Sequence, residues 1–255
     1  TGKTPLTIKL FNIIKKMGLN VVTSKKFYNN QVDEQILLKT KTKTIITKRR
    51  VDAINQAISN SNQVIVFDDG LQEKKIDYDL KFVCFKKKNW IGNGKLIPSG
   101  PLREKVENLK YYDVVFLNGI NENSDEIKKI IYKFNNNIEI FDTNYEIQNL
   151  NELDINSNYL IFSGIGDPKS FKEILLENNI KVVKEIIFPD HYNFKKKDIK
   201  NIVEESNKLN AKILTTEKDF TRLSDDDAKR INFLKIELKI INEKKLIDFL
   251  NDKLN

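Results

Sequence analysis

Short apolar runs recur along the chain and alternate with stretches of helical periodicity. The runs are rich in Val, Ile, Phe and Leu, as in strands that are buried on both faces of a parallel sheet. The stretches between them place apolar residues every three or four positions, which predicts amphipathic helices. We predict strands at 19–23, 64–67, 82–85, 114–117, 138–141, 159–162, 181–183 and 212–215, and helices at 6–17, 125–134, 169–178, 195–209 and 243–254.

This alternation predicts an α/β fold built on an open, mostly parallel, doubly wound sheet. Ligands of such sheets bind beyond the carboxyl ends of the strands, so polar residues that directly follow a strand are the first candidates for a functional site. Asparagine-rich sequence at 149–158 precedes the strand at 159–162. We therefore expect one domain in residues 1–150 and a second, smaller α/β subdomain in residues 151–255 that contributes to the active site.

The first five residues, Thr1-Gly2-Lys3-Thr4-Pro5, have the pattern that closes a phosphate-binding P-loop. In that motif backbone N–H groups at a helix N-terminus face an anionic phosphate, the lysine reaches the β- and γ-phosphates, and the threonine hydroxyl ligates Mg²⁺. The helix predicted directly afterwards supports this interpretation. The alternative is an unrelated Lys-Thr pair at a helix start. We predict Thr1, Gly2, Lys3 and Thr4 to bind a nucleotide, which makes the first domain a P-loop nucleotide-binding domain.

Composition and charge limit the class of partner. The 255 residues include 44 Lys and Arg against 36 Asp and Glu, a formal net charge of +8, which favours an anionic partner such as a phosphorylated substrate, nucleic acid or a lipid surface. The charge is scattered lysine, and a solvated lysine-rich surface is the alternative. The single cysteine, Cys84, excludes an internal disulfide and fits a reducing compartment. No apolar run reaches the ~18–20 residues of a membrane-spanning helix.

Two carboxylates, Asp68 and Asp69, follow the predicted strand at 64–67 and precede Gly70. Phosphoryl transfer needs Mg²⁺ to neutralise charge on the transferred group, and a carboxylate at a strand end can position that ion. The alternative is a simple Asp-Asp-Gly turn. Because the P-loop pattern also supplies a threonine hydroxyl, we predict a metal site made of Thr4, Asp68 and Asp69.

A tight segment at 92–104 holds three of the nine glycines and two of the five prolines. A loop that is so constrained is typical of a binding loop, and an ordinary connection is the alternative. Lys95 and Arg103 are cationic donors within it, and arginine can grip a carboxylate or a phosphate with two hydrogen bonds. We predict Asn93, Lys95 and Arg103 to bind the substrate.

The single histidine, His191, lies in the sequence Phe-Pro-Asp-His-Tyr-Asn-Phe at 188–194. A lone histidine is more often structural than catalytic. This one follows Asp190 in a proline-containing turn, where its ring can be oriented for acid–base chemistry. A further polar segment, 215–219, follows a predicted strand, and its Lys218 is interpreted either as an ion-pair partner or as a phosphate ligand.

Taken together, these segments resemble one family, the tetraacyldisaccharide 4'-kinases, which are the lipid A 4'-kinases of Gram-negative bacteria. Six segments occur in one order over nearly the whole chain, and the loop at 92–104 is the most specific. The segments are 1–5 (family pattern Gly-Gly-x-Gly-Lys-Thr-Pro), 68–72 (Asp-Asp-Gly-Phe/Leu-Gln), 92–104 (Gly-Asn-Gly-x-Leu-x-Pro-x-Gly-Pro-x-Arg-Glu), 164–168 (Gly-Ile-Gly-x-Pro), 188–194 (Phe-x-Asp-His-x-x-Phe) and 215–219 (Thr-Glu-Lys-Asp).

The resemblance implies a P-loop kinase that uses ATP and Mg²⁺ to phosphorylate the 4'-hydroxyl of a tetraacylated glucosamine disaccharide 1-phosphate, giving lipid IVA at the cytoplasmic face of the inner membrane. It implies catalytic roles for Lys3, Asp33 and His191. Asp33 aligns with the aspartate of the family's Gly-Asp-Glu-Pro segment and would take the hydroxyl proton, with His191 paired to it. It further implies contact with the membrane surface and no nucleic-acid partner. By itself, Asp33 is typical of a solvated polar turn.

The chain departs from the family pattern near its start. It begins inside the P-loop motif, so we expect an N-terminal truncation that removes the leading glycines, the first strand and an upstream membrane helix, and leaves a peripheral protein. The family's Ser-Arg-Gly-Tyr-Gly stretch is replaced at 24–29, and Val32 and Gln35 stand where the family has Gly and Pro beside Asp33. The alternative function is a P-loop ATPase switch or binding module without a sugar-lipid acceptor.

Overall fold

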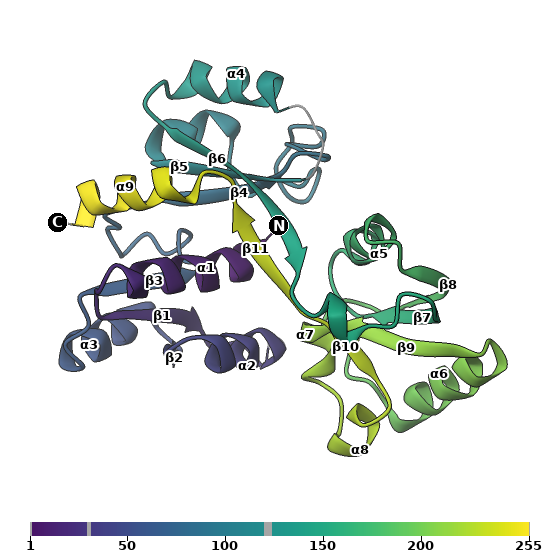
Figure 1. Ribbon diagram of the computed structural model, residues 1–255. Coiled ribbons are helices and arrows are strands. Elements are labelled where there is room, and N and C mark those ends of the chain that lie inside the picture. Colours follow the sequence, from purple (N-terminus) through teal and green to yellow (C-terminus); the bar gives the residue numbers. More distant parts are fainter. Residues whose placement is uncertain (1, 30–31, 120–123, 255) are drawn as a thin grey trace. The chain divides into compact units, whose positions relative to one another are not determined.

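The computed structural model describes residues 2–29, 32–119 and 124–254 (Figure 1). Its contacts divide the chain into two compact units. The first unit is made of Thr1–Lys25, Arg49–Tyr145 and Leu238–Asn255, and the second of Lys26–Lys48 and Glu146–Glu237. The chain therefore crosses between the units more than once, and one crossing lies close to the predicted boundary at residue 150. The predicted division into domains 1–150 and 151–255, with its functional assignments, stays a prediction.

The first unit contains a parallel strand pair that carries the P-loop end and the acidic pair. Strand β1 (Val21–Lys26) pairs with β3 (Val64–Asp68), and their register sets Lys25 opposite Asp68. Helix α1 (Lys3–Lys16) buries its apolar face and packs on β3. Helix α3 (Arg50–Ser59) precedes β3 and buries Ala53 and Ala57.

A four-stranded sheet completes the first unit, with the strand order β11-β6-β5-β4. Strands β4, β5 and β6 are parallel. Side chains from α1, the sheet and the last helix form one apolar cluster, and a second cluster lies between the sheet and α4. The elements are β4 (Phe82–Lys86), the 3₁₀ helix η1 (Val106–Tyr111), β5 (Val114–Asn118), α4 (Asp125–Phe134), β6 (Glu139–Ile147), β11 (Ile236–Ile240) and α9 (Glu243–Leu254).

The second unit is built on a sheet with the order β10-β9-β7-β8, in which the β10–β9, β9–β7 and β7–β8 pairs are parallel. Its core joins β7 and β9 to helix α6 (Figure 1). The elements are α2 (Val32–Lys41), β2 (Thr44–Thr47), the 3₁₀ helix η2 (Leu150–Glu152), β7 (Asn158–Ser163), α5 (Pro168–Glu177), β8 (Lys181–Ile187), α6 (Lys196–Lys208), β9 (Ala211–Thr216), α7 (Glu217–Phe220), α8 (Asp225–Ala228) and β10 (Asn232–Leu234).

The predicted α/β fold with mostly parallel strands is confirmed, and every predicted helix and strand is present, although the strand predicted at 138–141 extends to Ile147 and the one at 181–183 to Ile187. The hydrogen bonds divide the strands into separate sheets, where the sequence predicted one doubly wound sheet for the main domain. The pattern also missed α2, whose apolar residues do not line one face: of Val32, Ile36, Leu37 and Leu38, only Leu38 is buried. Asp33 thus belongs to a helix, and its interpretation as part of an irregular turn was wrong.

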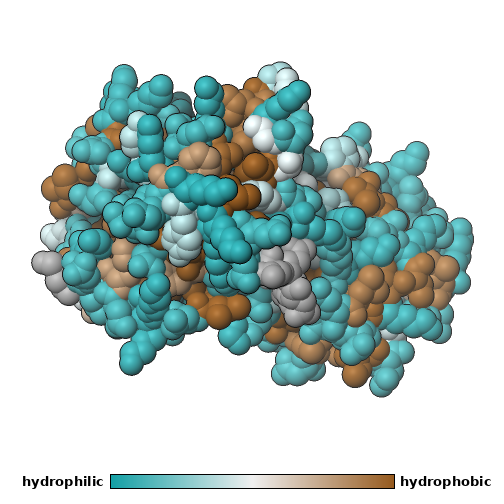
Figure 2. All heavy atoms as spheres, turned by 90° about the horizontal axis from the view of Figure 1, so that it is seen from above, coloured by the Kyte–Doolittle hydropathy of each residue, from teal (hydrophilic) through white to brown (hydrophobic). Residues whose placement is uncertain are grey.

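Cys84 lies in β4, as predicted, and burial raises the pKa of its thiol to about 12. The thiol therefore stays protonated at neutral pH. On the face shown in Figure 2 the surface is mostly hydrophilic, with hydrophobic residues dispersed over it. None of the helices in the described ranges combines the length and the apolar character that crossing a bilayer requires.

Candidate active site

The P-loop end lies at the start of α1 in the first unit. Gly2 caps this helix with a left-handed backbone (φ 86°), and a Cβ at this position would lie 2.9 Å from the Tyr145 hydroxyl. Only glycine meets both conditions without strain. Thr4, in the first turn, donates a hydrogen bond of 2.9 Å from Oγ1 to Oδ2 of Asp68. The predicted nucleotide-binding residue Thr1 lies outside the described residues.

Asp68 is the carboxylate that Thr4 reaches, and it is almost fully buried at the carboxyl end of β3. The Lys25 ammonium, also buried, lies 2.7 Å from the same Oδ2 atom. The β1–β3 register explains this ion pair, because residues opposite each other at the ends of parallel strands meet at one edge of the sheet. Sequence reasoning missed Lys25, because the strand predicted at 19–23 ended two residues before it, whereas β1 continues to Lys26.

Asp69 faces different partners. Its backbone has a positive φ of 57°, which is uncommon for a non-glycine residue. Its carboxylate lies 2.8 Å from Nη1 of Arg103 and 3.8 Å from Nζ of Lys3. Its carbonyl accepts a hydrogen bond of 2.6 Å from Arg50. The structure thus brings Lys3 and Arg103 together at Asp69, while Thr4 contacts Asp68.

The loop at 92–104 is held by its own polar groups. The Asn93 amide donates to the carbonyl of Ser99 (2.8 Å), and its Oδ1 accepts from the backbone N–H of Lys95 (3.1 Å). A Cβ on Gly100 would overlap the Lys95 carbonyl and the Asn93 side chain. Asn93 therefore shapes the loop. Lys95 is exposed, and Arg103 reaches Asp69.

The second unit contains the predicted acid–base pair. His191 Nδ1 lies 3.0 Å from Oδ1 and 3.1 Å from Oδ2 of Asp33. Asp33, in the first turn of α2, is only 3% exposed. Against an ionised carboxylate the ring must carry its proton on Nδ1, which then donates to Asp33. The nucleotide and metal residues lie in the first unit and the Asp33–His191 pair lies in the second. That the two groups act in one reaction stays a prediction.

The turn that carries His191 is constrained. His191 has a left-handed backbone (φ 59°), a conformation that is uncommon and costly for any residue other than glycine. Its N–H donates to the Gly164 carbonyl (3.0 Å) and to Oδ1 of Asp190 (3.0 Å). A Cβ on Gly164 would lie 3.1 Å from the Pro189 carbonyl, so this glycine allows the end of β7 to approach the turn closely.

The segment at 215–219 adds two charged groups to this centre. Lys218 Nζ lies 3.4 Å from Oδ2 of Asp33. Asp219 is fully buried, and burial raises the pKa of its carboxyl although Arg222, Thr216 and the Gly164 N–H oppose the shift. Of the two interpretations of Lys218, the structure supports the ion-pair partner.

Comparison with known proteins identifies the family. The model of one family, described as tetraacyldisaccharide-1-P 4'-kinase, matches residues 1–255. The chain belongs to this family. The resemblance that the six sequence segments indicated is therefore confirmed.

Curated tetraacyldisaccharide 4'-kinases are similar to this family member over most of its length. The protein of Pelagibacter ubique (strain HTCC1062) is 46% identical over 250 residues, which cover 98% of this chain and 80% of the relative. The protein of Rickettsia bellii (strain OSU 85-389) is 31% identical over 259 residues, which cover 95% of this chain and 78% of the relative.

A solved member of the tetraacyldisaccharide-1-P 4'-kinase family shares the fold. The crystal structure described as the "apo" form of LpxK from Aquifex aeolicus in complex with ATP superimposes with a TM-score of 0.71 at 21% sequence identity. The match covers 100% of this chain and 85% of the solved chain. At this identity the likeness establishes the fold.

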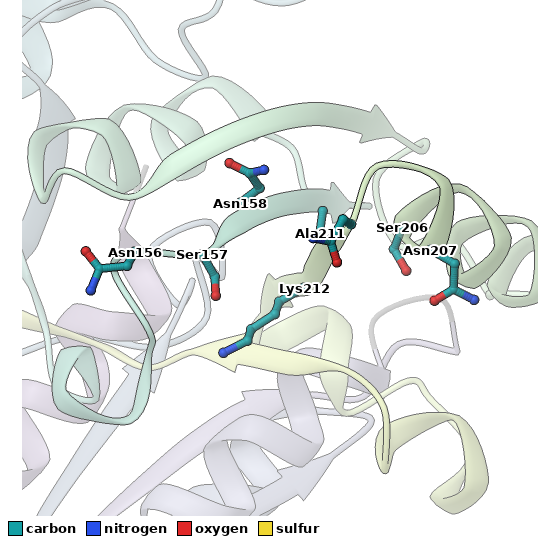
Figure 3. Close-up of a pocket in the computed structure, with 8 residues that line it drawn as sticks. Asn156, Ser157, Asn158, Ser206, Asn207, Ala211 and Lys212 are labelled. Atoms are coloured by element: carbon teal, nitrogen blue, oxygen red, sulfur yellow. The ribbon is translucent and has the colours of Figure 1, made fainter.

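A polar surface pocket of about 410 Å³ lies elsewhere in this kinase-family chain (Figure 3). It is at the amino ends of β7 and β9, where Asn158 and Ala211 begin these strands, whereas His191 and Lys218 follow the carboxyl ends of β8 and β9. Its lining is mostly asparagine and serine, with Lys212. It contains none of the predicted site residues.

Proposed function

We propose that this chain transfers the γ-phosphoryl group of ATP to the 4'-hydroxyl of a tetraacylated glucosamine disaccharide 1-phosphate, giving lipid IVA. Family membership over the whole chain establishes the kinase class. The Asp33–His191 contact is the observation that carries the assignment of the acceptor step, because a phosphoryl transfer to an alcohol needs a group that removes the hydroxyl proton.

The nucleotide is assigned to the start of α1. Backbone N–H groups at a helix N-terminus attract phosphate, and a lysine beside them neutralises charge on the β- and γ-phosphates. Gly2, Lys3 and Thr4 supply these groups, and Thr1 is proposed with them. The ATP complex of the solved Aquifex aeolicus relative supports this assignment. Lys3 would release its contact with Asp69, which at 3.8 Å is long and half-exposed, at little cost.

The donor set suits Mg²⁺. Thr4 Oγ1 and Asp68 Oδ2, which lie 2.9 Å apart, are hard oxygen donors of the kind that Mg²⁺ prefers. The described residues contain no group of three or more His, Cys, Asp or Glu that could hold a metal by themselves. This fits Mg²⁺, which usually takes one or two carboxylates and completes its shell with phosphate and water. When bound, the ion neutralises charge on the transferred phosphoryl group. Thr4, Asp68 and, more remotely, Asp69 are the proposed ligands.

The acceptor proton is assigned to Asp33. In the proposed step the 4'-oxygen forms a bond to the γ-phosphorus, the bond from that phosphorus to the ADP oxygen breaks, and the hydroxyl proton moves to an Asp33 carboxylate oxygen. His191 orients this carboxylate through its Nδ1–H. Because Asp33 is buried, water competes poorly for its oxygens.

The remaining assignments concern substrate and location. Asn93, Lys95 and Arg103 are proposed to serve substrate binding, Asn93 by shaping the loop and the two cations by direct contact. The lysine-rich surface favours a peripheral position on the anionic cytoplasmic face of the inner membrane. We propose no nucleic-acid partner.

The function is tested with the full chain, γ-labelled ATP and the tetraacylated disaccharide 1-phosphate in detergent micelles. ADP release and labelled lipid are measured together, with and without the lipid. We expect equal amounts of ADP and labelled lipid, and almost no ADP without the acceptor. ADP release that ignores the acceptor, with no labelled lipid, would overturn the proposal in favour of a P-loop ATPase. Asp33→Asn is the matched control, because it keeps the shape of the side chain and removes the base.

A further inference from the structure

Asp33 and His191 are surrounded by a second set of charged residues that the proposed reaction does not use. Lys218 and Arg222, on α7 and directly after it, approach the pair from the same segment of chain. Both come from sequence that the family resemblance left without a role. We propose that Lys218 and Arg222 are positioning residues for the base, Lys218 through the Asp33 carboxylate and Arg222 through the turn that carries His191. This inference rests on the proposed function of Asp33.

Lys218 contacts three carboxylates with one ammonium group. Its Nζ lies 3.4 Å from Oδ2 of Asp33, 3.2 Å from Oε1 of Glu34 and 3.6 Å from Oδ1 of Asp190. His191 Nδ1 lies 3.0 Å from Oδ1 and 3.1 Å from Oδ2, so the cation and the imidazole both contact the same carboxylate and meet at Oδ2. With only 18% of its side chain exposed, Lys218 is poorly screened by solvent. Its ammonium group is therefore placed to hold the Asp33 carboxylate in position and to stabilise its negative charge.

Arg222 stabilises the turn that carries His191 through hydrogen bonds to two backbone carbonyls. Its Nη1 donates to the Tyr192 carbonyl (2.9 Å), directly after His191. Its Nη2 donates to the Gly164 carbonyl (2.9 Å), which also accepts the His191 N–H, and to Asp219. These bonds help to hold the left-handed backbone of His191, which is costly by itself.

The third guanidinium nitrogen of Arg222, Nε, lies near the carboxylate of the proposed base, Asp33. The Nε–H is buried and makes no hydrogen bond within the described part of the chain, and it lies 3.7 Å from Oδ2 of Asp33. A buried donor that lacks a partner is costly and is rarely retained without a reason. Here it faces a carboxylate oxygen of the proposed base. Among the described residues, three charged or titratable side chains approach Asp33 directly: His191, Lys218 and Arg222. These in turn contact the carboxylates of Glu34, Asp190 and Asp219. The Lys41–Glu217 ion pair also joins α2 to α7.

The first experiment compares Lys218→Met with Lys41→Met. Lys41 contacts Glu217 at 2.6 Å across the α2–α7 packing, so its substitution removes the same charge without touching Asp33. For Lys218→Met we expect kcat at neutral pH to fall about tenfold or more, with the KM for ATP unchanged. We expect the acidic limb of the kcat/KM profile to move upward, because the variant removes a cation 3.4 Å from the carboxylate of the base. Lys218→Arg should restore most of the wild-type kcat and pH profile. Lys41→Met should have the same kcat and pH profile as the wild type.

The second experiment needs no catalysis. The chain has one histidine, so selective isotope labelling gives a single imidazole NMR signal. Loss of the Lys218 charge should make protonation of His191 easier and move the midpoint pH of this titration upward, whereas Lys41→Met should leave it in place. Arg222→Lys keeps the charge but cannot make both hydrogen bonds to the Tyr192 and Gly164 carbonyls. We therefore expect an altered chemical shift of the imidazole and a lower kcat.

The outcomes separate this inference from the proposed function. If wild-type protein transfers no phosphate to the lipid, the proposed function fails, and the imidazole titration still tests the contact. If Lys218→Met gives the same pH profile, kcat and imidazole midpoint as Lys41→Met, the positioning role of Lys218 is overturned. If Lys218→Met does not fold, judged by circular dichroism, Lys218→Gln and Arg222→Lys provide the same comparison.

Discussion

Nδ1 of His191 lies 3.0 Å from Oδ1 of Asp33, a residue 158 positions earlier in the chain. The contact joins the first turn of α2 to a strained turn after β8. The family resemblance implied this pairing, although no spacing along the chain predicts it. A buried carboxylate, an oriented imidazole and a left-handed backbone occur together, and strained backbone of this kind is concentrated at functional sites.

Removal of either member of this pair should impair the chemical step. For His191→Ala and Asp33→Asn we expect kcat to fall by a factor of about 10²–10⁴, the usual contribution of a general acid or base. The double variant should be little worse than Asp33→Asn, because the histidine acts through the aspartate. Steady-state kinetics with the lipid acceptor measure these effects. Tyr192→Phe is the control in the same turn, since the Tyr192 hydroxyl bonds to Asp198. A fully additive double variant would contradict the pairing.

The two acidic residues after β3 should differ in their effect on stability. Asp68→Ala leaves the buried Lys25 ammonium without its carboxylate, which should cost about 3–5 kcal/mol of unfolding free energy. Asp68→Ala combined with Lys25→Met should recover much of this loss. Asp69→Ala should change stability by less than about 1 kcal/mol, because its ion pairs are partly exposed. Urea denaturation measures all three, and equal losses for the two alanine variants would contradict the buried pair.

Gly100→Ala should destabilise the substrate loop. The added methyl group would overlap the Lys95 carbonyl and the Asn93 side chain, and overpacking of this kind costs about 1–3 kcal/mol. Gly18→Ala is the control for the KM: alanine there is strained by the positive φ of 89°, but Gly18 lies outside the loop and no atom lies within 4 Å of its Cβ position. Only Gly100→Ala should raise the KM for the lipid. Unchanged melting temperature and KM would show that the loop is not packed as described.

Asp142 should make stability depend on pH in the acidic range. Although burial opposes it, Lys128 and Lys87 lower the pKa of the Asp142 carboxyl. Its ionised form is therefore favoured in the folded state, and this stabilisation is present above the unfolded value of about 3.9 and is lost as the pH falls through the folded value. At pH 7, Asp142→Asn should lose about 2 kcal/mol.

The difference between wild type and Asp142→Asn should shrink as the pH falls below about 4, which melting temperatures at several pH values can follow. Asp226→Asn removes an exposed ion pair with Lys229 and should have almost no effect. A stability difference for Asp142→Asn that stays constant down to pH 2 would contradict the assignment.

The sequence predicted most of the local structure because apolar spacing is a local property. Helix 243–254 is found with the same ends, and the strand at 64–67 is extended by one residue, Asp68. The same pattern failed for α2, where the apolar face is weak, and there the tertiary packing against α7 supports the helix. The sequence pattern therefore did not predict that Asp33 lies in a helix and is buried.

By itself, the sequence determined the alternation of strands and helices, the acidic residues at a strand end and the family, since each depends on short segments or on their order. Beyond the Asp33–His191 pair that the family resemblance implied, only the tertiary structure decided which charged groups meet. Lys25 faces Asp68 because two strands pair in one register, and Lys218 and Arg222 reach Asp33 because α7 packs on α2. Such contacts depend on topology, and no spacing along the chain encodes them.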